Sequence, residues 1–389
     1  MQYNFDEIVD RRPLNSYKWN VKPNELPMGV ADMDFSPAPE IVSALEKRVH
    51  QGPFGYNFVP KSFFESYRYW WKKRHRLELD TNWMQFSTGV VPTISSLVRH
   101  LTSFDAQVMV LSPVYNIFYH SIRNNGRHIV ESRLNYEQGA YTIDWQDLEV
   151  KLANDKLEML IFSNPHNPTG YIWTLEELER LGELCIKYKV IVISDEIHCD
   201  LTHKGYHYQP FLGISEKINQ QIVMCAAPTK AFNIAGLQTS AVIVPNQKLR
   251  EKVRFAINTD EIAEPNSFAI QITEAVFKNG ENWLDALQDY LDKNHQYLIS
   301  TIEEKFPEIR VIPSRATYLA WLDCSSITEN TSDLCAFIRR ETGLILSAGN
   351  IFGGNGQHFI RWNYACSNEL LKDGVKRFEK AIIKYRKKF

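Results

Sequence analysis

The sequence contains no apolar run near the roughly 20 residues that a membrane-spanning helix requires. Its opening residues, Met-Gln-Tyr-Asn-Phe-Asp, lack the charged-then-apolar order of a secretory signal. The formal net charge of −2 leaves no overall basic footprint for nucleic acid. These absences predict a cytoplasmic protein that acts on neither membranes nor nucleic acid.

Cysteine is scarce, and its spacing argues against a Cys-x-x-Cys redox pair and against a zinc site. None of the 6 cysteines forms a Cys-x-x-Cys pair, and no Cys/His spacing matches a zinc site. Three of them, Cys185, Cys225 and Cys335, lie inside apolar runs, which predicts buried free thiols. Asp32 and Asp34 could form a metal pair, but turn and capping roles are more typical of closely spaced acids. We therefore expect no bound metal.

The sequence does contain a repeated strand–turn–helix pattern that begins near residue 84. Most of the candidate strands are continuous apolar runs, which indicates strands buried on both faces and hence a mostly parallel sheet covered by helices. The clearest helix, 174–189, begins at a capping box formed by Thr174 and Glu177. The predicted strands are 84–87, 108–112, 129–132, 157–163, 190–195, 222–226 and 240–245.

The rest of the chain predicts a second, smaller α+β domain. Residues 1–35 look irregular because prolines interrupt them, and Ser36 followed by Pro37 predicts a helix with Ser36 as its N-cap. A long helix near 283–306 leads into a C-terminal region of short strands and two helices. We expect an N-terminal arm that is part of the small domain (1–48), a large domain (49–285) and a C-terminal small domain (286–389).

Polar groups follow several predicted strands at their carboxyl ends, where open α/β sheets bind ligands. Asp195 ends one strand, and Lys230 comes just past another. A lysine with apolar backbone on one side and a cleft on the other can have a lowered pKa and act as a nucleophile. A lone lysine is more often a solvated surface residue, so this interpretation depends on the neighbouring groups.

The neighbouring groups match what pyridoxal phosphate requires of a protein. The aldehyde of the cofactor needs an amine, which Lys230 supplies, and its pyridine nitrogen needs a carboxylate, which Asp195 supplies. Each signal alone is common, and only their order and spacing as a set carry the prediction. The further groups are a helix start for the phosphate (Gly89, Val90 and Val91), an aromatic face for the ring (Tyr115), and donors for the ring oxygen (Asn167, with His198 as a further candidate).

Nine segments carry a resemblance to a known family: 30–35, 54–56, 89–91, 112–115, 163–170, 192–198, 227–238, 317–323 and 360–363. On them the chain resembles fold-type-I pyridoxal-phosphate enzymes, the class I and II aminotransferase superfamily. The spellings Ser-Asp-Glu-Ile-His and Ala-Asp-Met-Asp-Phe make it most similar to the cystathionine β-lyase, or C–S β-lyase, branch. These segments span nearly the whole chain.

The resemblance implies a role for each matching residue. Lys230, Asp195 and Tyr115 would be the catalytic residues, with Lys230 on the aldehyde, Asp195 at the ring nitrogen and Tyr115 stacked on the ring. Arg361 would grip the substrate carboxylate in a bidentate pair, although without the resemblance it would pass for a surface arginine. The phosphate would contact Gly89, Val90, Val91 and Thr229, together with Tyr56 of the neighbouring subunit of a homodimer; the ring oxygen would contact Asn167, with His198 as a further candidate; and the substrate would also contact Asn167, Tyr56 and Ala31.

The chain departs from the usual aminotransferase pattern around the lysine. Ala227 and Gln238 stand where many aminotransferases have Ser and Arg for the phosphate, and the lyase branch shows similar substitutions. Phosphate binding would then rest on the other groups. His198, Ala231 and Gly29 replace the frequent Tyr, Thr and Trp, and the change at Gly29 bears on the substrate pocket.

The resemblance implies a pyridoxal-phosphate C–S β-lyase. Such an enzyme would remove a thiol from cystathionine or a cysteine-like amino acid and release pyruvate and ammonia. An aminotransferase with the same cofactor is the first alternative, because both reactions begin with removal of the Cα proton. The second alternative is a cofactor-binding protein with an added regulatory role, which no basic stripe or extra domain supports.

Overall fold

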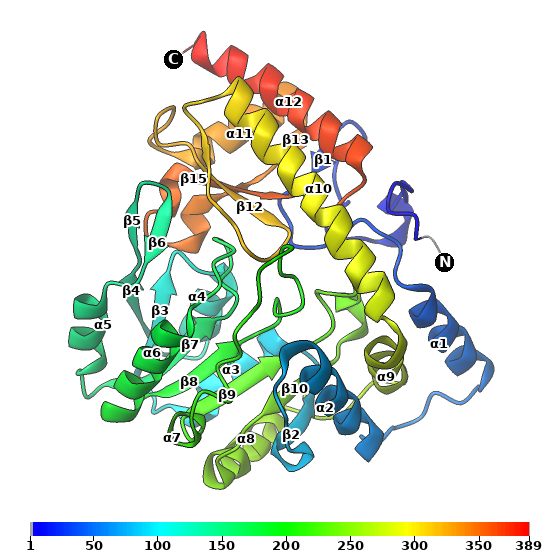
Figure 1. Ribbon diagram of the computed structural model, residues 1–389, viewed down its shortest axis with the longest axis vertical. Helices are drawn as coiled ribbons and strands as arrows, with labels where there is room; N and C mark the ends of the chain where they lie inside the picture. The colour runs from blue at the N-terminus through cyan, green and yellow to red at the C-terminus, as the bar shows by residue number, and fades with distance from the viewer. Residues whose placement is uncertain (1–2, 389) are drawn as a thin grey trace.

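The computed structural model describes residues 3–388 and has two regions joined by a long helix. The lower region in Figure 1 contains the largest sheet, and the upper region contains a smaller sheet beside the C-terminal helices. Helix α10 (Glu281–Lys305) runs between the two regions. No helix among the described residues is both long and apolar enough to cross a bilayer.

The large sheet has seven strands in the order β2-β10-β9-β8-β7-β3-β4. Its pairings are parallel except at β10, which runs antiparallel to both of its neighbours. The central strand β9 is buried along its whole length, as its continuous apolar run predicts. The strands are β2 (Met84–Ser87), β3 (Gln107–Ser112), β4 (His128–Arg133), β7 (Leu157–Ser163), β8 (Ile191–Asp195), β9 (Ile222–Ala226) and β10 (Ser240–Ile243).

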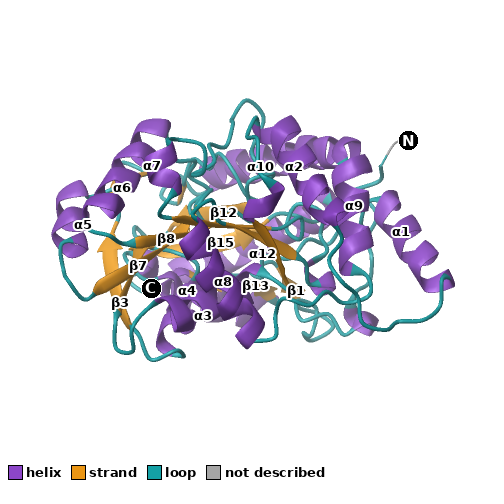
Figure 2. Ribbon diagram, turned by 90° about the horizontal axis from the view of Figure 1, so that it is seen from below, coloured by secondary structure: helices purple, strands orange, loops and turns teal. Residues whose placement is uncertain are grey.

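Two separate apolar cores lie on the two faces of this sheet. Successive residues of one strand alternate between them: Ile193 belongs to one core and Val192 to the other. Helices α3 (Val90–Leu101), α4 (Asn116–Arg123) and α8 (Gln247–Thr259) lie on one side, as Figure 2 shows. The other helices of this region are α2 (Lys61–His75), α5 (Trp145–Leu152), α6 (Leu175–Lys187), α7 (Glu216–Asn219) and α9 (Ala269–Asn279).

Several local sequence predictions are confirmed. Helix α6 begins at the predicted capping box, in which the Thr174 hydroxyl accepts from the backbone N–H of Glu177 and the Glu177 carboxylate accepts from that of Thr174. All 6 cysteines are free thiols, and all but the half-buried Cys335 are buried. The mostly parallel sheet covered by helices is also as predicted.

The smaller sheet has the order β11-β12-β15-β14, and all of its pairings are antiparallel. In addition, β1 from the N-terminal arm pairs with β13 from the C-terminal region. The arm therefore lies against the C-terminal region, while the predicted domain boundaries stay predictions. The elements are β1 (Leu26–Pro27), β11 (Arg310–Val311), β12 (Leu319–Asp323), β13 (Leu344–Ile345), β14 (Ser347–Ala348), β15 (Phe359–Asn363), α11 (Thr331–Thr342) and α12 (Asn368–Arg386).

Two predictions about the arm are wrong. Helix α1 (Pro39–His50) begins at Pro39 with Ala38 as its N-cap, not at Ser36. A residue before proline is pushed into the extended region, and Ala38 has ψ of 138°, so the helix can begin only at the second proline. The side chains of Asp32 and Asp34 cap no described helix; both form ion pairs with Arg11.

The turn after β7 depends on Gly170, whose φ is +67°. A Cβ at this position would lie 1.9 Å from Ser314 Oγ and 2.6 Å from the Ala316 carbonyl oxygen. The backbone N–H of Gly170 donates to the His166 carbonyl at 2.7 Å, and its carbonyl accepts from the backbone of Arg315 and Ala316. This residue therefore ties the turn that carries Asn167 to the smaller sheet's region.

Gly170→Ala is expected to lower the free energy of unfolding by more than about 1 kcal/mol, because alanine is strained at positive φ and its Cβ has no room. Urea denaturation measures the change. Gly236→Ala is the control, since a Cβ at Gly236 meets no described atom within 4 Å. Equal unfolding midpoints for the two variants would contradict this account of the turn.

Candidate active site

A cavity of about 260 Å³ lies at the carboxyl ends of the large sheet's strands. Every predicted site residue except Arg361 and Tyr56 lines it. The parallel strands β3, β7, β8 and β9 point their carboxyl ends toward the same edge, which is why residues far apart in sequence meet here. Lining residues outside the predicted set include Thr88, Ser163, Ile197, Ala235 and Gln238.

Lys230 lies in the turn after β9 and is half-buried. Its Nζ donates to the backbone carbonyl of Ala31 at 2.6 Å. Burial lowers the pKa of Lys230; the Arg361 guanidinium lowers it further, and Asp32 opposes the shift. The amine is therefore neutral at a lower pH than an ordinary lysine, which suits a nucleophile or a base.

Asp195 is the last residue of β8 and is buried. Its Oδ1 accepts from the backbone N–H of Ile197 at 3.2 Å. Burial raises the pKa of Asp195 to about 7, although the Ile197 N–H and the charge of Lys230 oppose the shift. A cationic group placed against this carboxyl would restore its charge, so the site is suited to a protonated ring nitrogen.

Arg361 lies on β15 and is buried beside Asn167, a lining residue of the cavity, so it is not a surface arginine. It donates from Nη1 to Asn167 Oδ1 at 3.2 Å and from Nη2 to the Gly29 carbonyl at 3.0 Å. Its Nε has no partner in the described part of the chain. Burial lowers the pKa of Arg361 to about 10, so it remains charged at neutral pH and ready to accept a carboxylate.

Two further polar groups line the cavity, the His198 ring and the start of helix α3. His198 is buried, its Nδ1 has no partner among residues 3–388, and burial lowers the pKa of His198 to about 3. Its imidazole is therefore neutral. Helix α3 begins after Gly89, and no described side chain caps it, so the backbone N–H groups of its first turn face the cavity beside Thr229.

Tyr56 does not reach this cavity. It is fully exposed in the segment between α1 and α2, together with the exposed rings of Phe54 and Phe58. One chain therefore brings together every predicted site residue except this one.

Two contributors escaped the sequence prediction. Tyr318 donates its hydroxyl to the Ala31 carbonyl at 3.1 Å, next to Lys230, and only its place in the matched segment 317–323 signalled it. The Gly29 carbonyl binds Arg361, but a backbone oxygen leaves no mark in a sequence. A Cβ at Gly29 would lie 2.8 Å from Ser347 Oγ, so a larger side chain would have to displace β14.

His75, Cys199 and Asp200 bring their donor atoms within 4.8 Å of one another in a separate place. Asp200 already accepts from Trp70 Nε1 at 3.0 Å and lies 2.9 Å from His75 Nε2. These contacts account for the cluster as a buried hydrogen-bond network.

The donor set fits pyridoxal phosphate. The half-buried amine of Lys230 suits the aldehyde, and the buried Asp195, whose pKa burial raises, suits the ring nitrogen. The start of α3, which no described side chain caps, suits the phosphate, and His198 Nδ1, which has no partner among residues 3–388, suits the ring oxygen. Tyr115 lines the same cavity and can cover the ring.

The chain matches the family model described as aminotransferase class I and II over residues 23–378. It is 38% identical over 386 residues to cystathionine β-lyase PatB of Bacillus subtilis (strain 168), covering 97% of this chain and 100% of that protein. Cystalysin from Treponema denticola, solved with pyridoxal 5′-phosphate, has a TM-score of 0.96 at 30% identity, covering 99% and 100% of the two chains. The PLP-bound C–S lyase from Staphylococcus hominis has a TM-score of 0.91 at 33% identity, covering 98% and 99%.

In the protein without cofactor, Lys230 is expected to react with acetic anhydride at a lower pH than the exposed Lys204, because burial lowers the pKa of Lys230. Arg361→Met should move the Lys230 profile to higher pH, since it removes a nearby positive charge, whereas Arg361→Lys should leave it closer to wild type. Peptide mass spectrometry across a pH series measures both lysines. A Lys230 profile that coincides with that of Lys204 would contradict the assignment.

Proposed function

Because the chain belongs to the aminotransferase class I and II family, we propose that it is a pyridoxal-phosphate-dependent C–S β-lyase. It removes a thiol from Cβ of cystathionine or a cysteine-like amino acid, and one water hydrolyses the remaining three-carbon fragment to pyruvate and ammonia. The observation that carries this proposal is one cavity lined by Lys230 and Asp195, with Arg361 bonded to its lining residue Asn167. Full-length similarity to proteins named as C–S lyases favours this activity over others in the family.

Pyridoxal phosphate supplies an electron sink that stabilises negative charge at the substrate Cα. Lys230 binds the aldehyde and, as a free amine, takes the Cα proton at Nζ; its lowered pKa leaves more of it neutral for this step. Asp195 would hold the proton on the ring nitrogen, and a cation there would oppose the rise that burial causes in the pKa of this carboxyl. Lys230 thus supplies the base for the proton transfer, and Asp195 stabilises the ring that receives the electrons.

The other site residues bind and orient. Arg361 would donate to the substrate carboxylate from Nε, which has no partner among the described residues, and from its Nη groups; Asn167 and His198 would contact the ring oxygen. Tyr115 covers the ring, and Ala31 contacts the substrate. The phosphate contacts Gly89, Val90, Val91 and Thr229.

An aminotransferase would use the same residues for the first proton transfer. Purified protein mixed with cystathionine, without any keto acid, is expected to release pyruvate and a free thiol. Amino transfer to an added keto acid, with no pyruvate formed in its absence, would replace the lyase proposal by the aminotransferase alternative.

Lys230→Ala is expected to reduce turnover by about 1,000-fold or more, because the base and the covalent attachment are both lost. Lys204→Ala is the matched control, since Lys204 is 82% exposed and lies outside the cavity. Steady-state rates of pyruvate release compare the two variants. Full activity in the Lys230 variant would show that another lysine is used.

We also propose that two chains form a homodimer in which Tyr56 enters the partner's site. The exposed aromatic segment around Tyr56 supports this, because three large rings at Phe54, Tyr56 and Phe58 are unusual on a free surface. Location in the cytoplasm stays a prediction.

Mixed dimers test this arrangement. A dimer of one Tyr56→Ala chain and one Lys230→Ala chain, purified with two tags, has one site with both changes and one with neither, so about half of the wild-type activity should return. If Tyr56 acts in its own chain, each site carries one change and no activity returns. Homodimers of the two variants are the controls.

A further inference from the structure

A row of backbone carbonyls in the N-terminal arm contacts both cations of the site. The row consists of the carbonyl groups of residues 29–33, called here the carbonyl row. The Gly29 carbonyl accepts from Arg361, and the Ala31 carbonyl accepts from Lys230. The arm therefore supplies the hydrogen-bond acceptors that orient these two side chains from a segment far away in sequence.

The remaining carbonyls of the row are also bound by side chains. Asn363, two residues after Arg361 on β15, donates from Nδ2 to the Val30 carbonyl at 2.6 Å and to the Asp32 carbonyl at 2.8 Å. Lys18 Nζ donates to the Asp32 carbonyl at 2.8 Å. Arg11 Nη1 donates to the Met33 carbonyl at 2.6 Å, and Asn233 Nδ2 donates to it at 3.2 Å. Side chains of the arm and side chains from the rest of the fold thus both fix the path of the carbonyl row.

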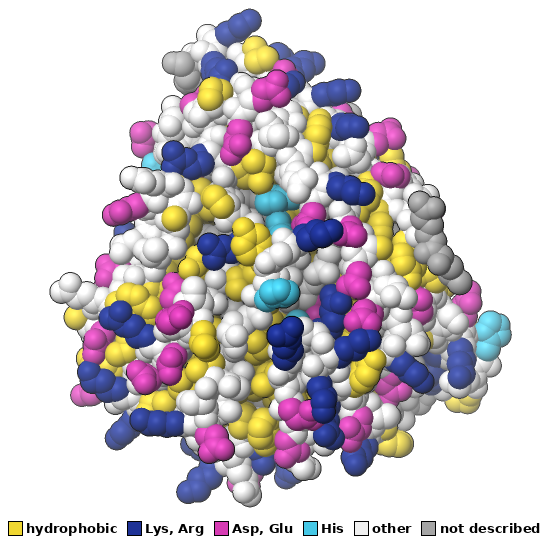
Figure 3. Space-filling view, viewed as in Figure 1, with side chains coloured by type: hydrophobic (Ala, Val, Ile, Leu, Met, Phe, Trp, Pro, Cys, Tyr) yellow, Lys and Arg dark blue, Asp and Glu magenta, His cyan; other side chains and the backbone are white. Residues whose placement is uncertain are grey.

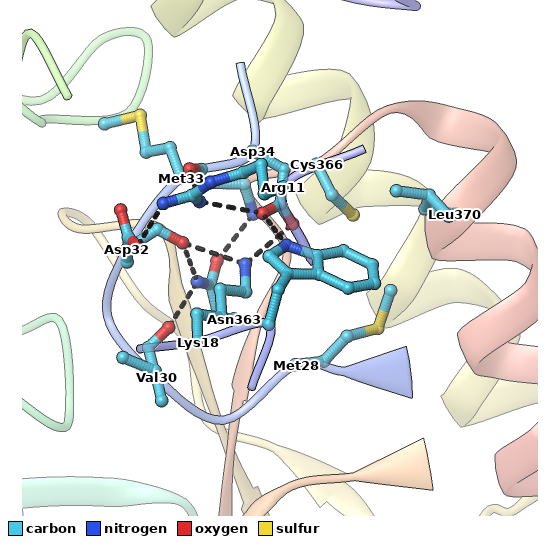
Figure 4. Close-up of polar contacts among 12 residues, drawn as sticks. Arg11, Lys18, Met28, Val30, Asp32, Met33, Asp34, Asn363, Cys366 and Leu370 are labelled. Atoms are coloured by element: carbon cyan, nitrogen blue, oxygen red, sulfur yellow. Dashed lines mark hydrogen bonds and ion pairs between the residues drawn. The ribbon is translucent and has the colours of Figure 1, made fainter. Parts of the chain in front are cut away.

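Asp34 is the centre of the contacts on the arm's side, as Figure 4 shows. Its Oδ2 accepts from Lys18 Nζ at 2.7 Å. Its Oδ1 accepts from Trp19 Nε1 at 2.7 Å and from Arg11 Nη1 at 3.1 Å. Asp34 is only 6% exposed and Lys18 only 2%.

Lys18 and Arg11 each bridge from the Asp34 carboxylate to the carbonyl row. Burying such charges is costly unless they are paired and hydrogen-bonded, and here they are both. Without the Asp34 charge, Lys18 would keep a buried positive charge with no carboxylate against it, whereas Arg11 would still have Asp32 at 2.6 Å. The Lys18 side chain would then leave the row or draw in water.

We propose that Asp34 is a positioning residue: through Lys18 and Arg11 it sets the carbonyl row, and the row orients Lys230 and Arg361 for catalysis. The Ala31 carbonyl holds the free amine of Lys230 together with the Tyr318 hydroxyl, so the amine's lone pair has a fixed direction. The Gly29 carbonyl accepts from Nη2 of Arg361 and holds the guanidinium beside Asn167. This role rests on the proposed function, which assigns the chemistry to those two residues.

The test compares Asp34→Asn with Asp10→Asn in the complete protein loaded with pyridoxal phosphate. Asp10 lies in the same arm and pairs with Arg12, but its side chain is 64% exposed. Asp34→Asn is expected to lower kcat/KM for cystathionine by about 100-fold, because small misplacements of reacting groups cost that much. Both kcat and KM should change, since Lys230 and Arg361 are both misplaced, while Asp10→Asn should match wild type.

Two further measurements do not depend on whether the enzyme releases a thiol from cystathionine. Trypsin should cut after Lys18 faster in cofactor-free Asp34→Asn than in wild type, because Lys18 is no longer held. The visible absorbance of the bound cofactor should report weaker amino-acid binding by the loaded variant at unchanged cofactor content. If wild type releases no pyruvate, the proposed function fails, and these two readouts still judge the role of Asp34.

Wild-type kcat/KM, or wild-type amino-acid affinity, in Asp34→Asn would overturn the proposal. If this variant does not fold, the paired change Lys18→Met with Asp34→Asn removes both buried charges together and keeps similar shapes. The paired variant should also lose about 100-fold in kcat/KM because the bridge to the Asp32 carbonyl is gone. Wild-type kinetics in the folded paired variant would show that the cluster serves stability alone.

Discussion

Lys230 lines one small cavity, and Arg361 lies beside it against Asn167. The closeness of these two basic side chains is the constraint around which the rest of the site is arranged. Burial lowers the pKa of each from its ordinary value, and the charge of Arg361 lowers the pKa of Lys230 further. Backbone carbonyls of Ala31 and Gly29 offset part of that cost by accepting hydrogen bonds. The positive charge that these carbonyls do not offset favours binding of an anionic cofactor and an amino-acid carboxylate.

The same constraint explains why distant segments converge. The large sheet delivers Lys230 and Asp195 at adjacent strand ends, where β8 and β9 run in parallel. Arg361 comes from β15 of the small sheet, and the carbonyls that accept from Arg361 and Lys230 come from the arm. Because the groups come from three parts of the fold, a change in how the arm packs would move the Ala31 carbonyl that accepts from Lys230.

Much of the fold and site could be predicted from sequence because the signals are local. Continuous apolar runs mark buried parallel strands, and the residue after each run is placed at one shared edge of the sheet. Asp195 and Lys230 were found in this way. The contacts of Asp34 were not, because its partners Lys18 and Arg11 are identified only by long-range packing. Backbone acceptors such as the Ala31 carbonyl have no residue type of their own, and the start of α1 depended on which of two prolines could be helical.

The central claim is that Lys230 is the amine that binds the cofactor. Borohydride reduction of the loaded protein fixes pyridoxal phosphate to the lysine that holds it, and peptide mass spectrometry then identifies that residue. The account predicts a single modified peptide carrying the cofactor on Lys230. A cofactor fixed to a different lysine, or to none, would contradict it.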